Sequence, residues 1–276
     1  MTLPTKKIYI DTRFKTKTSN STSDFTIQLP KTVHLPKNTV FYIENFVCSN
    51  AFYAVETGIN DQFYCRIYNT DKIITIPSSN YNGITFASEL QTQLNAASVH
   101  FFTVVFNINR NNITITPEAG LSFYVFTEND LLSYYNNTWT GPNYNSQATN
   151  STNDILNNNL IETTKQYINS NPYTSGSLEL LCFRNIYITS GNLSSFTTIG
   201  ARGESSIIKK VPVSSSFGYL IIDSFTSNHD WLDCGNMTLS NLEFQLRDSK
   251  GKVIPLHGSH VSFSIVFEIK TKTDDS

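Results

Sequence analysis

The sequence has few charged residues. Asp, Glu, Lys and Arg make up 15% of its 276 residues, and the formal net charge is -2. Soluble domains usually carry about a quarter charged residues. A chain without a strong net charge has no long-range field to attract nucleic acid or an anionic membrane. Ser, Thr and Asn must cover much of the surface, and such neutral surfaces pack against neighbouring proteins at little desolvation cost.

The sequence also lacks paired cysteine motifs. No CxxC spacing occurs among Cys48, Cys65, Cys182 and Cys234, which excludes zinc-ribbon and dithiol redox motifs. Apolar or aromatic residues lie close to all four, so we predict buried thiols in a reducing compartment. A disulfide between two of them stays open, because sequence alone does not pair cysteines.

Long apolar segments are missing too. The N-terminal string MTLPTKKIYIDTRFKTKT has no apolar core of the kind found in secretion signals. No run approaches the roughly 18–20 apolar residues of a membrane span. We therefore expect neither secretion nor a membrane span.

Catalytic motifs are absent from the sequence. GxSxG, P-loop, GxGxxG and HExxH do not occur, and the string GARGESS at 200–206 does not join a strand to a helix as a phosphate loop does. His257 and His260 have no cysteine or carboxylate cluster beside them, which favours a turn before a strand over a metal site. We predict no cofactor, no metal and no enzymatic activity.

One nucleophile hypothesis stays open. The string SNHDWLDCGN brings His229, Asp230, Asp233 and Cys234 close in sequence. A Cys–His nucleophile requires both residues in one cleft with a third group that orients the base. The alternative is an ordinary loop around Trp231.

Apolar residues on alternate positions dominate what is present. Phe25, Ile27 and Leu29 share one face of a predicted strand, as do Leu242, Phe244 and Leu246 of another. The clearest strand is the last one, in which every second residue of 261–269 is apolar. This pattern is typical of half-buried antiparallel sheets, so we predict an all-β protein. The last strand is too hydrophobic for an open edge and is expected inside a sheet.

Two hairpins and one helix complete the predicted elements. FNINRNNITIT turns through asparagines, which tolerate positive φ, and LEFQLRDSKGKVIPL turns at Gly251. Phe86, Leu90, Leu94 and Ala97 form one apolar stripe, which predicts a helix from Thr85 to about Ala97 with Thr85 as its cap. A weaker helical pattern covers 154–168.

These elements predict one β-sandwich with a decorated connection. We assign residues 1–24 to an N-terminal arm, 25–70 and 177–271 to the sandwich core, and 71–133 to an inserted β/α subdomain. Residues 134–176, rich in Asn, Ser and Thr, form a loop or insertion, and 272–276 form a tail.

Two groups of residues are candidates for contact with other molecules. The N-terminal arm carries Lys6, Lys7, Arg13, Lys15 and Lys17, which would be solvated or would contact a neighbour or a polyanion such as a packaged genome. Aromatic and basic residues in predicted loops are candidate interface residues, since Tyr, Trp and Arg are enriched at interfaces: Tyr134, Tyr135, Tyr144, Arg202 and Trp231.

Three blocks of the sequence carry a family resemblance. They are IDTRFKTKTSNSTSDFTIQLPKTVHLPKNTVFYIENFVCSN at the start, IPSSNYNGITFASELQTQLN with FTVVFNINRNNITIT after it, and SIIKKVPVSSSFGYLIIDSF with LSNLEFQLRDSKGKVIPLHGSHVSFSIVFEI near the end. In these patterns the chain resembles minor capsid, or penton, proteins of the Polinton/Maverick group and related adinto-like viruses. The resemblance covers most of the chain except about 134–176.

The resemblance implies a jelly roll of two antiparallel sheets. It further implies a homopentamer at the icosahedral vertex, contacts with the major capsid protein, and residence in the virion after synthesis in the host cytoplasm or nucleus. Major capsid proteins of this lineage are double jelly rolls of about twice this length, so the chain is too short for that role. The alternative is a spike, attachment or lectin-like module of similar fold, with a pocket lined by Trp139 or Trp231.

Overall fold

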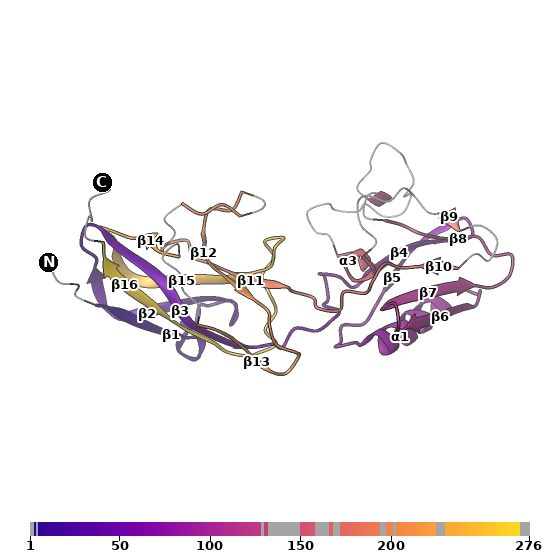
Figure 1. The fold of residues 1–276 in the computed structure, drawn as a ribbon, viewed down its shortest axis with the longest axis horizontal. Coiled ribbons are helices and arrows are strands. Elements are labelled where there is room, and N and C mark those ends of the chain that lie inside the picture. Colours follow the sequence, from indigo (N-terminus) through magenta and orange to yellow (C-terminus); the bar gives the residue numbers. More distant parts are fainter. Residues whose placement is uncertain are drawn as a thin grey trace. The chain divides into compact units, whose positions relative to one another are not determined.

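The computed structural model describes residues 3, 5–127, 130–131, 150–157, 166–167, 172–193, 197–200, 203–224 and 230–270. The chain divides into two compact units. We call residues 1–52 together with 183–276 the sandwich unit, and residues 53–182 the insert unit. Figure 1 shows the strands of both.

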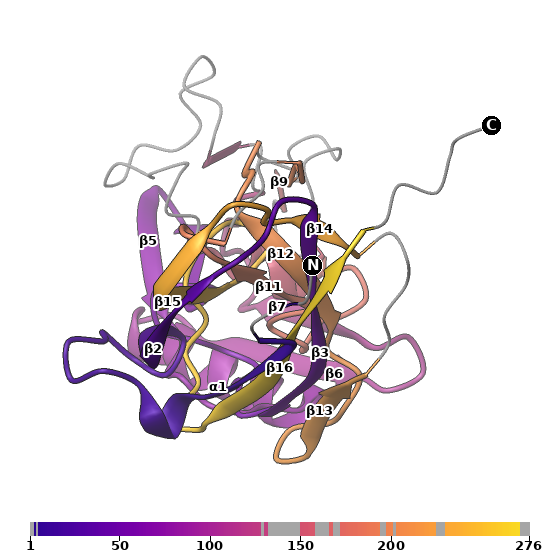
Figure 2. The same ribbon diagram turned by 90° about the vertical axis from the view of Figure 1, so that its left-hand side faces the viewer.

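The sandwich unit holds two antiparallel sheets. Sheet A has the order β1-β16-β3-β13, and β14 pairs with β3 beside β13. Figure 2 labels β3, β13, β14 and β16 of this sheet. The strands of sheet A are β1 (Lys7–Asp11), β3 (Thr39–Ser49), β13 (Leu220–Asp223), β14 (Leu232–Asp233) and β16 (Val261–Ile269). A short 3-10 helix, η1 (Thr12–Phe14), follows β1.

Sheet B has the order β12-β11-β15-β2. Its strands are β2 (Asp24–His34), β11 (Asn185–Thr189), β12 (Ile207–Pro212) and β15 (Thr238–Arg247). In β15, Leu242, Phe244 and Leu246 are buried and their neighbours Glu243 and Gln245 are not. The sheet therefore has one apolar and one polar face, as period-2 patterning requires.

Aromatic rings join the two sheets. Phe244 of sheet B and Phe263 of sheet A lie edge to face with ring centroids 5.1 Å apart. Phe25 packs beside Phe244 at 5.5 Å, and Phe46 beside Phe263 at 6.4 Å. The predicted jelly-roll sandwich is confirmed, and β16 lies between β1 and β3 rather than at an edge.

A lysine also crosses between the sheets. Lys209 of β12 donates a hydrogen bond to the backbone carbonyl of Ile43 at 3.1 Å and forms an ion pair with Asp223 of β13 at 3.3 Å. Both charged side chains are largely buried. The ion pair therefore links β13 of sheet A to β12 of sheet B.

A β-bulge in β3 keeps the apolar side chains on the core side. Phe41 and Ile43 are buried, and so are Phe46 and Cys48, although the two pairs differ in parity. Asn45, with φ of 53°, is the extra residue, and the register with β16 shifts beside it. Asparagine tolerates this left-handed conformation.

Asn45→Val is expected to lower the free energy of unfolding by about 1–2 kcal/mol, because a β-branched residue is strained at positive φ. Asn45→Gly should change it by less than about 0.5 kcal/mol, since glycine adopts this φ without strain. Chemical denaturation of the two variants tests the role of the bulge. Equal stabilities would show that the backbone conformation at residue 45 does not matter.

The insert unit has its own sheets and its own core. One sheet has the order β5-β4-β8-β9 and the other β10-β7-β6. The elements are β4 (Gln62–Ile67), β5 (Thr70–Thr75), α1 (Gly83–Ala96), β6 (Phe102–Asn107), β7 (Asn112–Pro117), β8 (Phe123–Val125), α3 (Asn153–Leu156), β9 (Gln166–Tyr167) and β10 (Tyr173–Thr174).

Helix α1 supplies much of this core. Its buried residues include Phe86, Leu90 and Leu94, the predicted apolar stripe. The cap differs from the prediction: Asn82 is the N-cap and accepts from the Thr85 N–H, while the Thr85 side chain accepts from the Asn82 N–H. This reciprocal capping box moves the helix start to Gly83.

Helix α1 also protects the edge of β6. The Gln91 side chain accepts from the backbone N–H of Val104 at 2.8 Å, and the Asn95 side chain accepts from that of Phe102 at 2.7 Å. Both residues lie on one face of α1, one turn apart. They satisfy backbone donors that an edge strand otherwise offers to another chain.

Gln91→Ala is expected to speed hydrogen exchange at the Val104 amide, and Asn95→Ala at the Phe102 amide, each by roughly fivefold, since one hydrogen bond contributes about 1 kcal/mol. Ser88→Ala, an exposed change on the same helix, is the control and should leave both amides protected. Exchange measured residue by residue by NMR checks this. Unchanged protection in the Gln91 and Asn95 variants would contradict edge capping by α1.

The predicted segment boundaries differ from the observed ones. Strand β4 was expected in the sandwich core, which was to end at residue 70, but it pairs with β5 and β8 of the insert unit. Residues 1–24 were expected as an arm, but β1 pairs with β16. The 102–117 hairpin and the positive φ of Gly251 are confirmed. The weak helical pattern at 154–168 gives only the short α3, and Gln166–Tyr167 is a strand; its residues 158–165 and 168 lie outside the described part.

Candidate functional site

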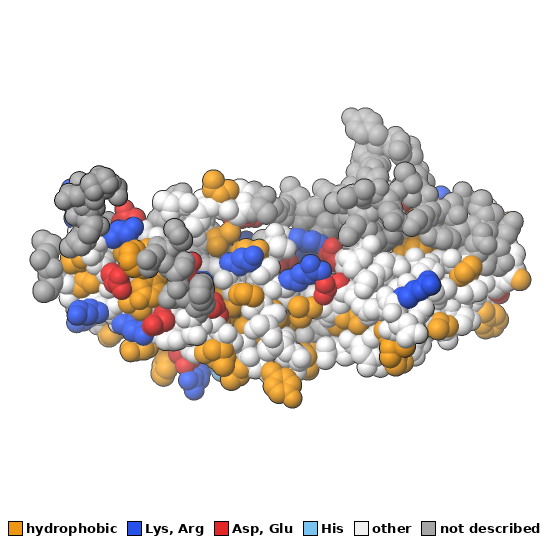
Figure 3. Space-filling model, in the orientation of Figure 1, with side chains coloured by type: hydrophobic (Ala, Val, Ile, Leu, Met, Phe, Trp, Pro, Cys, Tyr) orange, Lys and Arg blue, Asp and Glu red, His pale blue; other side chains and the backbone are white. Residues whose placement is uncertain are grey.

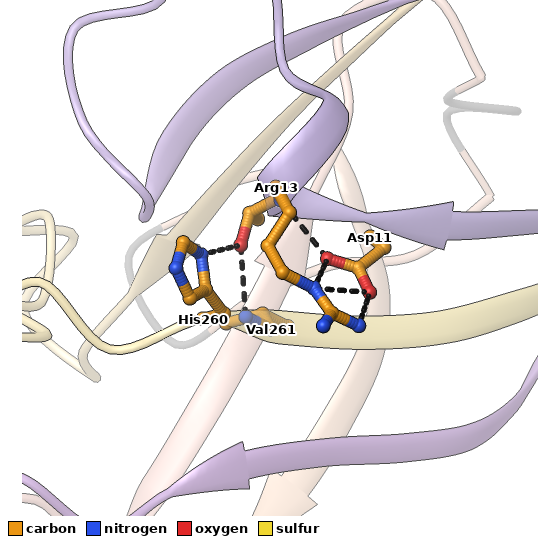
Figure 4. A network of polar contacts seen from close by, with 5 residues as sticks. Asp11, Arg13, His260 and Val261 are labelled. Carbon is orange, nitrogen blue, oxygen red and sulfur yellow. Dashed lines mark hydrogen bonds and ion pairs between the residues drawn. The ribbon is translucent and has the colours of Figure 1, made fainter.

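The N-terminal strand is fastened to the sandwich by polar contacts. The Thr12 hydroxyl accepts from the Val261 N–H at 3.0 Å and lies 3.2 Å from His260 Nδ1 (Figure 4). The Arg13 guanidinium and N–H donate to the Asp11 carboxylate, with Nε 3.0 Å from both oxygens. These hydrogen bonds lower the pKa of Asp11. The end of β1 is therefore held against the start of β16.

The basic residues of the N-terminal segment are partly neutralised within the sandwich unit. Lys7 forms an ion pair with Glu44 of β3, and Arg13 one with Asp11. Lys6 and Lys17 are exposed, and Lys15 is half-buried. The segment is thus a sheet edge followed by a turn, with less free positive charge than its sequence indicates.

Two of the four sheet edges in the sandwich unit carry the usual protection against pairing with other chains. β2 contains exposed Pro30 and Lys31, and β12 contains exposed Lys210 and Pro212. Proline and lysine on edge strands prevent unwanted strand pairing, so these two edges are unfavourable for association. The third edge, β1, carries only Lys7, which is paired with Glu44 of β3.

The fourth edge, β13, is apolar and exposed. Leu220 and Ile222 are 54% and 61% exposed, and Tyr219 just before the strand is 70% exposed. Ile222 lies opposite Val47 of β3, and Leu220 opposite Ser49. We call Tyr219, Leu220 and Ile222 the β13 edge. An exposed apolar edge strand without lysine or proline is typical of a protein interface.

The opposite edge of sheet A also presents aromatic side chains. Tyr9 on β1 is 77% exposed, and Phe14 in η1 is 76% exposed. Lys7 Nζ lies 5.4 Å from the centroid of the Tyr9 ring. We call Lys7, Tyr9 and Phe14 the β1 edge.

Most of the loop residues predicted to form an interface cannot be assigned to a site. Tyr134, Tyr135, Tyr144, Trp139 and Arg202 lie outside the described residues. Trp231 is half-buried, and Lys270 Nζ lies 5.4 Å from the centroid of its ring. The ring is therefore a cation–π partner within the sandwich unit.

The described chemistry around Cys234 does not fit a nucleophile. Burial raises the pKa of the Cys234 thiol to about 12, whereas a nucleophilic cysteine requires a lowered pKa. The thiol lies 3.5 Å from the carbonyl of Thr39. His229, the expected base, lies outside the described residues. Cys48 and Cys65 are also buried and form no disulfide. Cys182 is half-buried, and its sulfur accepts from the Asn60 side-chain amide at 3.7 Å.

The described His, Cys, Asp and Glu side chains do not gather into a metal site. Within the described ranges no group of three or more His, Cys, Asp or Glu is placed to hold a metal ion. His260 contacts Thr12 at the entry to β16, and His257 lies in the preceding turn at φ 47°. None of the described helices is long and apolar enough to cross a membrane.

The surface matches the low charge of the sequence. On the face drawn in Figure 3, hydrophobic side chains reach the surface between polar neutral ones, and charged side chains are scattered. The candidate site is therefore an interaction surface, and its most distinctive part is the β13 edge.

Comparisons with known proteins give a fold likeness. Neither a family model nor a curated protein matches the sequence. A crystal structure of the selenomethionine-labelled mavirus penton protein is similar to this structure, with a TM-score of 0.50 and 14% sequence identity over 95% of this chain and 99% of that chain. At this identity the likeness concerns the fold alone.

Sequence reasoning missed the β13 edge. The string YLIID gives three apolar residues in a row, and such a run does not distinguish a strand buried on both faces from one with an exposed apolar face. One feature of the sequence could have indicated this edge: the string YLIID contains apolar residues but neither lysine nor proline.

Proposed function

We propose that the chain is a penton-type minor capsid protein that assembles as a homopentamer at an icosahedral vertex and contacts the major capsid protein. The observation that carries the proposal is the jelly-roll fold with its inserted unit, similar over 95% of the chain to the mavirus penton protein. A viral subunit of this kind works by its surfaces and has no need of a catalytic centre.

The surface properties support this role. A ring of identical subunits requires two different patches on each copy that fit one another. The sandwich unit carries apolar residues at both edges of sheet A, the β13 edge and the β1 edge. The low charge reduces the cost of burying such patches against a neighbour.

The proposal includes contact with packaged DNA through the N-terminal segment. Lys7 and Arg13 are paired with carboxylates, which leaves Lys6, Lys15 and Lys17 as the residues for a phosphate contact. Each phosphate contact makes binding depend on salt, so DNA bound through this segment would dissociate as salt is raised.

Sedimentation equilibrium over a wide concentration range tests the proposed assembly. The expected result is a species of five times the 31.1 kDa chain mass that forms as concentration rises. A trimer would contradict the penton role and favour an attachment module. A monomer at every concentration would contradict both.

A further inference from the structure

The β13 edge differs from the β2 and β12 edges in having no lysine or proline that opposes strand pairing. Its outward side chains Leu220 and Ile222 are both more than half exposed. Alternate N–H and C=O groups of an edge strand point away from its sheet. Among the described residues no strand pairs with the outer side of β13. A further strand can add to sheet A there, and an apolar face would accompany the backbone pairing.

The strand directions in sheet A indicate which strand fits there. β1 is antiparallel to β16, β16 to β3, and β3 to β13. The two edge strands β1 and β13 therefore run in opposite directions. A second copy rotated about an axis parallel to the strands keeps its directions, so its β1 would meet β13 of the first copy in antiparallel orientation.

The side chains of the two strands also match. Placing Tyr9 opposite Leu220 brings two exposed outward-facing apolar residues together. The same antiparallel register puts Ile8 opposite Ile221 and Lys7 opposite Ile222, where the alkyl chain of the lysine lies against the isoleucine. Apolar pairs on facing strands stabilise a ladder, and like charges directly opposite each other destabilise it.

We propose that β13 of one copy pairs with β1 of the next copy, so that sheet A continues from subunit to subunit around the ring. The proposal rests on the homopentamer proposed above and names the surfaces that form it. The contact is heterologous, since each copy uses β13 on one side and β1 on the other. Heterologous contacts close into rings when the rotation between copies allows it.

A charge on the β13 edge tests the pairing. Ile222→Lys is expected to raise the concentration at half-assembly at least tenfold, because a lysine at this position disfavours strand addition. Val105→Lys, at a position 57% exposed in the insert unit, is the matched control and should assemble like wild type. The thermal midpoint of the separated monomer should stay unchanged, since residue 222 is exposed.

A disulfide tests the register independently. The double variant Tyr9→Cys/Leu220→Cys should form covalent ladders of up to five chains under mild oxidation, because directly opposed residues have Cβ atoms about 4.5–5.5 Å apart. Each single variant is the control and should give no species larger than a covalent dimer.

The outcomes separate this inference from the proposed function. If wild type forms pentamers but Ile222→Lys assembles equally well and the double variant forms no ladder, the pairing is wrong and the penton role stands. If wild type stays monomeric, the penton role is contradicted and the pairing with it. Ladders that extend beyond five chains would contradict a closed fivefold ring.

Discussion

Replacing Phe263 by alanine is expected to lower the free energy of unfolding of the sandwich unit by about 3–5 kcal/mol, the usual cost of removing a large core aromatic. Phe263 is 2% exposed on β16. Its ring packs against Phe244 of the other sheet and Phe46 of the neighbouring strand. The loss of the ring would leave a cavity between the two sheets. The surrounding side chains cannot fill this cavity unless a strand moves.

Phe14→Ala is the matched control, because the same side chain is removed from the same unit at a position 76% exposed. It should change the unfolding free energy by less than about 0.5 kcal/mol. Urea denaturation followed by fluorescence measures both. Comparable losses in the two variants would show that the ring contacts between the sheets do not stabilise the sandwich.

Replacing Lys209 by methionine is expected to lower the unfolding free energy by about 3 kcal/mol, because it removes the ammonium partner of a carboxylate that is mostly shielded from water. The side chains of Lys209 and Asp223 are 7% and 13% exposed. Lys209 also donates to the Ile43 carbonyl, so the variant leaves a second acceptor without this donor.

Lys210→Met, at the exposed neighbouring position, is the control for the loss of one lysine and should change stability by less than about 0.5 kcal/mol. The double variant Lys209→Met/Asp223→Leu should recover much of the loss, since an apolar pair of similar volume replaces a buried ion pair at little cost. If Lys209→Met is no less stable than Lys210→Met, the ion pair does not fasten the sheets.

Local patterning was sufficient to predict several elements of the fold. Alternation in β15 and β16 placed Phe244, Phe263 and their apolar neighbours correctly in the core. The asparagine-rich turn allowed the β6–β7 hairpin to be predicted. The turn residues determine the type of turn, and the type of turn determines how the two strands pair. These features depend on residues close together in sequence.

Features that depend on distant pairing could not be predicted in this way. β1 pairs with β16 near the other end of the chain, and nothing in either strand specifies the other. In β4 the consecutive residues Phe63, Tyr64 and Cys65 are all buried, and such a run does not indicate which sheet contains the strand. The bulge at Asn45 changes which residues of β3 face the core. In the sequence, only the asparagine itself indicates that a bulge lies there.

The candidate site was the part least accessible from the sequence. Exposed basic residues suggested a charged arm, but Lys7 and Arg13 form ion pairs within the sandwich unit. The β13 edge, which the structure makes the most distinctive surface, contains only apolar residues. Composition cannot distinguish these from core residues, because exposure depends on which strand ends the sheet.

Electron microscopy of the purified assembly tests the central claim most directly, since class averages report both the number of copies and their arrangement. The account predicts closed rings with fivefold symmetry in which the sandwich units lie side by side. Threefold particles, open filaments or isolated monomers at concentrations well above the micromolar range would contradict it.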